Sequence, residues 1–335
     1  MAMMSIGDLS QSFFLQRRGT ALKVELNRLT EELATGQVSD VKARLAGNVS
    51  YLAGIERDIM ALGAYQVTTT EAAQFTNAVQ EALGRVQTST GDMANAVLRV
   101  GSTTVHTVVE QISNDAETEL ANMMSALNGQ IAGRSLFAGA ATNVAPLKGA
   151  DTLLGALRTE LAGATSVDEV IADVQTWFDD PAGFEAVIYG GSTDDLPPFQ
   201  VNADTRLPMT VRADDAEIKD ALMHTVLAAL ATDPALLLDE AEQRDLLLHA
   251  GGGLLSDQDK LTGVRGNVGF IEQRIEDATA RNAAELTSLD FAKNAFLAAD
   301  PYETATNLEN VQFQLQSLYQ ITARMAQLSL GNFLR

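Results

Sequence analysis

The sequence predicts a mainly α-helical protein in which both ends of the chain build one long antiparallel helical rod, or coiled coil, with an α+β domain inserted in the middle. All seven prolines fall between residues 146 and 301, and a proline inside a helix costs about 3 kcal/mol. Apolar residues recur at helical spacing on both sides of that region. We therefore expect an N-terminal helical part of the rod at 1–142, an acidic variable domain at 143–255 and a C-terminal helical part of the rod at 256–335.

The N-terminal part begins with an apolar stripe at helical spacing, formed by Phe14, Leu22, Leu26, Leu29 and Leu33. Gly36 follows this stripe, and glycine is common just beyond the last turn of a helix because it adopts positive φ without strain. The pattern predicts that the first helix ends at this glycine and that further helices cover much of 52–100 and 105–131.

The C-terminal part carries a narrower stripe after Pro301, with the steps of three and four residues that are typical of a coiled-coil seam. Its members are Leu308, Val311, Leu315, Leu318, Ile321, Met325 and Leu328, and the last turn adds Leu330, Phe333 and Leu334. Neither end can bury its stripe alone, so we expect the two ends to pack antiparallel and to offer their remaining apolar surface to other copies of the chain. Together with the N-terminal stripe, these residues are the predicted assembly interface.

The middle of the chain has a different pattern. It contains 20 acidic and 6 basic residues, which gives a net charge of −14 out of −21 for the whole chain. Short apolar runs predict strands at 184–189, 199–202 and 208–213, and helical patterns occur at 152–162, 167–178 and 215–231. The glycine-rich segment 249–255 predicts a flexible junction back to the rod, whose next helix is expected to start with Ser256 or Asp257 as its cap.

The acidic composition excludes several partners. With a sequence pI of about 4.4, the chain repels DNA, RNA and anionic membranes, so we predict neither nucleic-acid nor membrane binding. There is no cysteine, which excludes disulfides and thiolate metal sites. The N-terminus lacks the basic start and apolar run of a cleaved secretory signal, and no stretch reaches the roughly 18 apolar residues of a membrane helix. The chain is expected to be cytosolic, or to be exported by a route that removes no signal.

Residues suited to catalysis or metal binding form no matching set. His106, His224 and His249 are the only histidines, and no two of them have the i, i+4 spacing of a helical metal site. The segment 256–263 resembles the start of a calcium loop, but its glycine and closing glutamate are misplaced. There is no Gly-x-Ser-x-Gly motif. We therefore predict no catalytic, cofactor-binding or metal-binding residues, no cofactor and no enzymatic activity.

Three segments resemble the bacterial flagellin family. The segment LNRLTEELATGQ (26–37) is similar to the end of the family's first helix, GNVGFIEQRIEDA (266–278) to the start of its penultimate helix, and QFQLQSLYQITARMAQLSLGNFLR (312–335) to its last helix. The resemblance covers about 1–142 and 256–335. The stretch after Gly36, QVSDVKARLAGNVSYLAGIER, departs from the family pattern.

Within this family, the ending MAQLSLGNFLR and the segment GRSLFAGAAT (133–142) are more similar to hook–filament junction members than to the flagellins of the filament. The resemblance implies a structural part of the bacterial flagellum, located outside the cell and exported by the flagellar type III apparatus without a cleaved signal. The partners it implies are further copies in a ring, a neighbouring hook-associated protein, flagellin, and an export chaperone before secretion. A flagellin filament subunit is the main alternative, and a helical adhesin or secretion-tip protein with a partner-binding or cation-binding acidic domain is another.

Overall fold

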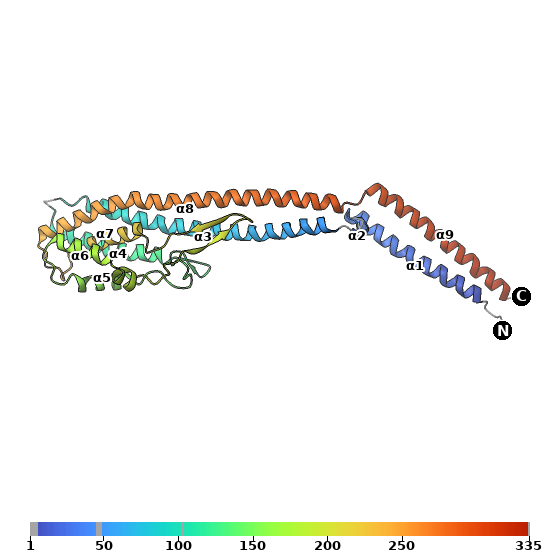
Figure 1. Cartoon of the computed structure of the whole chain (residues 1–335), viewed down its shortest axis with the longest axis horizontal. Coiled ribbons are helices and arrows are strands. Elements are labelled where there is room, and N and C mark those ends of the chain that lie inside the picture. The colour runs from blue at the N-terminus through green and yellow to red at the C-terminus, as the bar shows by residue number, and fades with distance from the viewer. Residues whose placement is uncertain (1–5, 45–48, 102–103, 334–335) are drawn as a thin grey trace. The chain divides into compact units, whose positions relative to one another are not determined.

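The computed structural model describes residues 6–44, 49–101 and 104–333, and most of these residues are helical (Figure 1). The chain divides into two compact units, one formed by Met1–Gly63 with Ala284–Arg335 and the other by Ala64–Ala283. The predicted fold class is confirmed, because the first and last helices pack on each other and a mixed region with short strands lies between them in sequence. The two units have bounds of their own, and the division at residues 142 and 255 stays a prediction.

The first unit is built from the two ends of the chain. It contains the following elements: α1 (Ile6–Thr35), α2 (Val41–Arg44), the start of α3 (Ser50–Val97), the end of α8 (Glu240–Leu297) and α9 (Pro301–Phe333). Helix α1 ends as predicted, since Gly36 has φ +69° and its amide donates to the Glu32 carbonyl oxygen at 2.9 Å. Helix α9 starts with Pro301 after Asp300, whose Oδ1 accepts hydrogen bonds from the amides of Tyr302 and Glu303.

Helices α1 and α9 lie side by side and run in opposite directions (Figure 1). Their shared core consists of the buried side chains Leu22, Leu29, Val311, Leu315 and Leu318, with Leu15, Leu26 and Leu308 partly buried against them. The register is fixed beyond the helix ends, where Val38 donates to the Leu297 carbonyl oxygen and Ala299 donates to that of Gly36. The two stripes expected from the sequence therefore form one seam within a single chain.

The second unit combines the rest of α3 and α8 with the middle of the chain. Its remaining elements are α4 (His106–Leu127), β1 (Gln130–Ile131), β2 (Arg134–Ser135), α5 (Ala150–Glu160), α6 (Val167–Asp179), a π-helical turn η1 (Pro181–Glu185), β3 (Leu196–Gln200), β4 (Arg206–Met209) and α7 (Ala216–Leu230). Within this unit α3 and α8 are antiparallel neighbours, as contacts from Gln80 to Arg265 and from Gln87 to Gln258 indicate. One large apolar core joins these helices to α4–α7 and to the hairpin of β3 and β4.

The predicted helices of the middle region are confirmed, but its strands are only partly so. The run 184–189 is not a strand. It continues from η1, and the Ile188 amide donates to the Phe184 carbonyl oxygen at 2.9 Å. The aromatic ring of Phe184 is buried and stacks on Phe178 with ring centroids 5.1 Å apart, so packing outweighs the local preference for β-structure. The other two runs do pair as β3 and β4, antiparallel and a few residues earlier than expected.

The predicted flexible junction at 249–255 is also wrong, because α8 runs unbroken from Glu240 to Leu297. Two of the three glycines instead allow close helix packing. A Cβ on Gly251 would lie 2.6 Å from a methyl group of Val97, and a Cβ on Gly253 would lie 2.2 Å from the ring of His224. Neither Ser256 nor Asp257 caps a helix, since both lie inside α8, and Asp257 is fully buried.

Candidate assembly surface

The residues of the predicted assembly interface differ in exposure. Seven of them form the seam of α1 and α9 described above: Leu22, Leu26, Leu29, Leu308, Val311, Leu315 and Leu318. Leu15 also belongs to the seam, although the predicted set lacked it. The seam residues affect a neighbouring molecule only through the helix pair that they hold together. Three others are exposed, with 66% of Phe14, 42% of Leu33 and 50% of Ile321 accessible to solvent. Their accessible side chains are free to contact a second molecule.

The remaining members of the predicted set lie toward the end of α9. Met325 is half-buried. Leu328, Leu330 and Phe333 belong to the backbone of α9, but their side chains lie outside the described part of the chain, as does Leu334 entirely. Their part in assembly stays a prediction.

Sequence reasoning missed a second set of exposed apolar side chains on the same two helices. Phe13 and Val24 of α1 are exposed, and so are Phe313 (70%), Tyr319 and Tyr302 of α9. Their position in the helical repeat could have revealed them. Phe313, for example, lies between the seam residues Val311 and Leu315, so its side chain must point away from the seam. Several large apolar side chains exposed on one helix pair are a feature of surfaces that bind other proteins. The helix pair therefore offers an apolar outer surface in addition to its buried seam.

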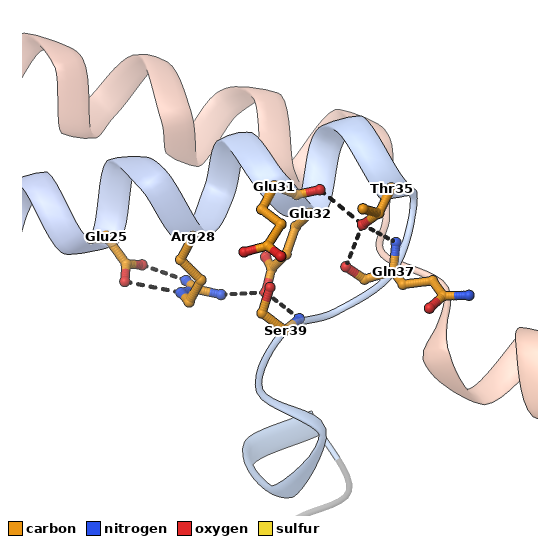
Figure 2. A network of polar contacts seen from close by, with 7 residues as sticks. All are labelled: Glu25, Arg28, Glu31, Glu32, Thr35, Gln37 and Ser39. Atoms are coloured by element: carbon orange, nitrogen blue, oxygen red, sulfur yellow. Dashed lines mark hydrogen bonds and ion pairs between the residues drawn. The ribbon is translucent and has the colours of Figure 1, made fainter.

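A network of polar contacts joins the last turns of α1 to the turn that follows this helix (Figure 2). Glu32, only 3% exposed, accepts a hydrogen bond from Arg28 Nη1 at 2.6 Å and one from the Ser39 amide at 2.9 Å. Arg28 also binds both carboxylate oxygens of Glu25. These hydrogen bonds hold the pKa of Glu25 below its usual range and raise that of Arg28. The network ties the turn after α1 back onto the helix, so the outer surface rests on a fixed backbone.

The Thr35 side chain closes the same turn from the other side (Figure 2). Its hydroxyl donates to the Glu31 carbonyl oxygen at 2.8 Å and accepts from the Gln37 amide at 3.3 Å. The sequence indicated only that a helix ends at Gly36. The network depends on side chains that meet when the turn folds back, which no local pattern reveals.

One group of ionisable side chains in the second unit lies between α7 and α8, and another surrounds Arg212, which pairs with Asp195 and Asp214. His224 Nδ1 donates to the buried carboxylate of Asp257 at 2.6 Å, and Lys260 Nζ contacts Asp257 at 3.1 Å and Asp220 at 2.6 Å. The hydrogen bond to Asp220 raises the pKa of Lys260. Burial, and secondly the nearby His224, lower the pKa of His249. The buried members of this group satisfy one another by mutual contacts, and these contacts join α7 to α8.

Two further properties of the described residues bear on the class of protein. No three of their His, Asp and Glu side chains are placed so as to hold a metal ion. None of the described helices combines the length and the apolar character needed to span a membrane.

Comparison with known proteins supports a flagellar origin. Residues 256–334 match the family model described as the bacterial flagellin C-terminal helical region. Among solved structures, the fold is similar to that of a protein from Vibrio parahaemolyticus described as a "putative flagellar hook-associated protein". The TM-score is 0.51 and the sequence identity 13%, and the match covers 75% of this chain and 97% of the other. At this identity the likeness concerns the fold alone. A comparison with curated proteins finds no match.

Residues 256–334 are therefore similar to the C-terminal helical region of bacterial flagellins, and α9, which lies within these residues, packs against α1 at the other end of the chain. The fold of the chain is similar to that of the Vibrio parahaemolyticus protein.

Proposed function

We propose that the chain is a hook–filament junction protein, a hook-associated subunit that links the hook of a bacterial flagellum to the filament through packing of its terminal helices. The observation that carries this proposal is the apolar outer surface of the α1 and α9 pair, which exposes Phe14, Phe313 and Ile321. A helix pair with its own buried seam needs no further apolar side chains for its stability, so exposed ones favour contact with other subunits. The flagellin C-terminal region at 256–334 and the fold of a hook-associated protein support the flagellar setting.

The partners follow from this role. Further copies of the chain would form a short ring, with a hook-associated protein on one side and flagellin on the other. The subunit would leave the cell through the flagellar type III apparatus without a cleaved signal, bound before export to a chaperone. Its site of action would be the flagellum outside the cell.

The decisive experiment removes the protein from its source cell. Cells without it should carry hooks that lack filaments and should release flagellin into the medium, because the filament has no junction on which to grow. The wild-type chain should restore filaments. A chain with Phe313→Ser and Ile321→Ser should be exported without restoring them, whereas Leu237→Ser, a matched change at an exposed leucine of the second unit, should restore them fully. Filaments of normal length in the deleted cells would refute the junction role.

The end of α9 offers a second test of the same proposal. Removing residues 328–335 should abolish incorporation into flagella and leave the second unit folded, because its bounds of 64–283 exclude the deleted stretch. Incorporation of the shortened chain would show that the last turns contribute nothing to assembly.

A flagellin filament subunit is the second candidate, favoured by the family match at the C-terminal region. Purified chain added to filament seeds distinguishes the two roles. A filament subunit extends the seeds into long filaments, whereas a junction protein forms short caps on isolated hooks and does not elongate.

A further inference from the structure

We propose that the α3 and α8 pair of the second unit carries a self-complementary surface through which two copies of the chain bind each other. The two copies would be related by a two-fold axis, with their α8 helices antiparallel. We call this surface the charged strip. It consists of a cationic groove around Arg85 and Arg265, an acidic groove around Glu272 and Glu276, and Gly269 between them. The inference is independent of the junction role, since it concerns a different surface and a two-fold pair rather than a ring.

The cationic groove has a volume of about 1090 Å³ and is lined by α3, α4 and α8. Its charged lining residues are Arg85, Arg265 and the exposed Glu81, so two positive charges stand against one negative charge. Arg265 is held there by neutral acceptors: its Nε donates to Gln80 Oε1 at 3.1 Å and its Nη1 to Gln87 Oε1 at 2.6 Å. Arg85 is exposed and makes no ion pair within the described part of the chain. Both guanidinium charges are therefore available to a partner's carboxylates, on a protein whose net charge is −21.

The acidic groove lies farther along the same two helices and has a volume of about 520 Å³. Small side chains such as Ala73 and Ala280 line it, together with Glu272 and Glu276. Glu272 Oε1 is shielded from solvent and has no hydrogen-bond partner among the described residues. Shielding a carboxylate oxygen without a donor is unfavourable. This groove therefore lacks a donor, and the cationic groove of a second copy would supply one.

The spacing along α8 places these groups on one side of the helix. Arg265, Gly269, Glu272, Glu276 and Ala280 follow one another in steps of three and four residues. Arg265 and Glu276 are 11 residues apart, roughly 16 Å at 1.5 Å per residue. If a two-fold axis perpendicular to α8 passes near Gly269, the arginines of each copy face the glutamates of the other. The same patch on both molecules then forms the contact, as two-fold symmetry requires.

The glycine near the proposed axis allows the two helices to approach closely. Gly269 has no side chain, and a Cβ at this position would meet only Gln80 Nε2 at 3.8 Å, which is an ordinary contact. A cysteine is therefore tolerated there, and the chain contains no cysteine of its own. A disulfide between two copies at this position reports directly on the proposed axis.

The test uses single cysteines in the full-length chain under mild oxidation. Gly269→Cys should form a disulfide-linked dimer in high yield, because the two positions 269 meet at the axis. Ala280→Cys is the matched control on the same side of α8, and it should not, because its two copies would lie roughly 30 Å apart. No dimer with Gly269→Cys, or equal yields from both variants, would overturn the proposal.

Charge reversal in the Gly269→Cys chain tests the pairing itself. Arg85→Glu or Glu276→Arg should each lower the dimer yield about tenfold or more, since attraction is replaced by repulsion, and the two together should restore it. Arg281→Glu, the same charge change on the opposite side of α8, should leave the yield unchanged. A yield insensitive to Arg85→Glu and Glu276→Arg would overturn the charge pairing. The deletion phenotype above is measured separately, so either proposal can fail while the other stands.

Discussion

Replacing each glycine of the 251–253 run by alanine, one at a time, tests whether these residues are in α8 to permit close helix packing. Gly252 is exposed and a Cβ there would meet nothing within 4 Å. Alanine is favoured over glycine in a helix interior by about 0.5–1 kcal/mol. Gly252→Ala should therefore stabilise the second unit by that amount.

The two neighbouring glycines should respond in the opposite direction. At Gly253 the new Cβ would lie 2.2 Å from Cδ2 of His224, and that ring cannot move aside without breaking its 2.6 Å hydrogen bond to Asp257. At Gly251 the Cβ would lie 2.6 Å from Cγ1 of the buried Val97. Overpacking of this kind costs about 1–3 kcal/mol, which outweighs the helix preference. Each variant should lose about 1–2 kcal/mol.

Urea unfolding followed by tryptophan fluorescence measures these changes. Trp177 is the only tryptophan and lies in α6 against Phe178, so its emission reports on the second unit. In thermal unfolding followed by the same fluorescence, a change of 1 kcal/mol corresponds to about 2–4 °C in Tm for a unit of this size. The cost of Gly253→Ala should shrink when His224 is also replaced by alanine. Equal stabilisation by alanine at all three positions would refute the packing explanation.

Three further predictions concern other parts of the molecule. Burial raises the pKa of Asp215 to about 6, above its value in the unfolded chain, so the cost of this carboxyl to stability grows as pH rises from about 4 through 6. Asp215→Asn should therefore stabilise the second unit by about 3 kcal/mol at pH 7.5 and by only about 0.5 kcal/mol at pH 4, as measured in urea titrations. Leu315→Ala should cost about 2–3 kcal/mol and speed amide hydrogen exchange in α1 and α9, while Ile321→Ala, at an exposed site on the same helix, should not. Glu32→Ala should expose the Ser39 amide to exchange and cost about 1–2 kcal/mol, and Glu32→Gln, which keeps an acceptor, should recover most of the loss.

These three predictions have clear contrary outcomes. A gain from Asp215→Asn that is the same at both pH values would show that burial of the charge is not its cause. Equal exchange in the Leu315→Ala and Ile321→Ala chains would mean that the seam does not hold the helix pair together. An unprotected Ser39 amide in the wild-type chain would remove the basis for the Glu32 prediction.

The sequence by itself determined the helices of both ends and how they pair. The repeats at Leu22, Leu29, Leu315 and Leu318 lie at helical spacing, and a narrow apolar stripe has to be covered by a partner. The end of α1 was equally readable, because positive φ at Gly36 is a property of that residue and its immediate neighbours. Such features depend on local backbone geometry, so the residues of a short stretch of sequence are enough to predict them.

Only the tertiary structure decided which side chains those helices bury and what the glycines do. Glu32 is buried while its apolar neighbour Leu33 is exposed, because Arg28 and the Ser39 amide satisfy the carboxylate. Glycine is needed inside this helix because groups on other helices, Val97 of α3 and His224 of α7, lie too close for a larger side chain at Gly251 and Gly253. Judged from local sequence alone, the glycine run would be a junction and the glutamate would be exposed. Contacts between segments far apart in the sequence outweigh these local preferences, and a local pattern does not contain those contacts.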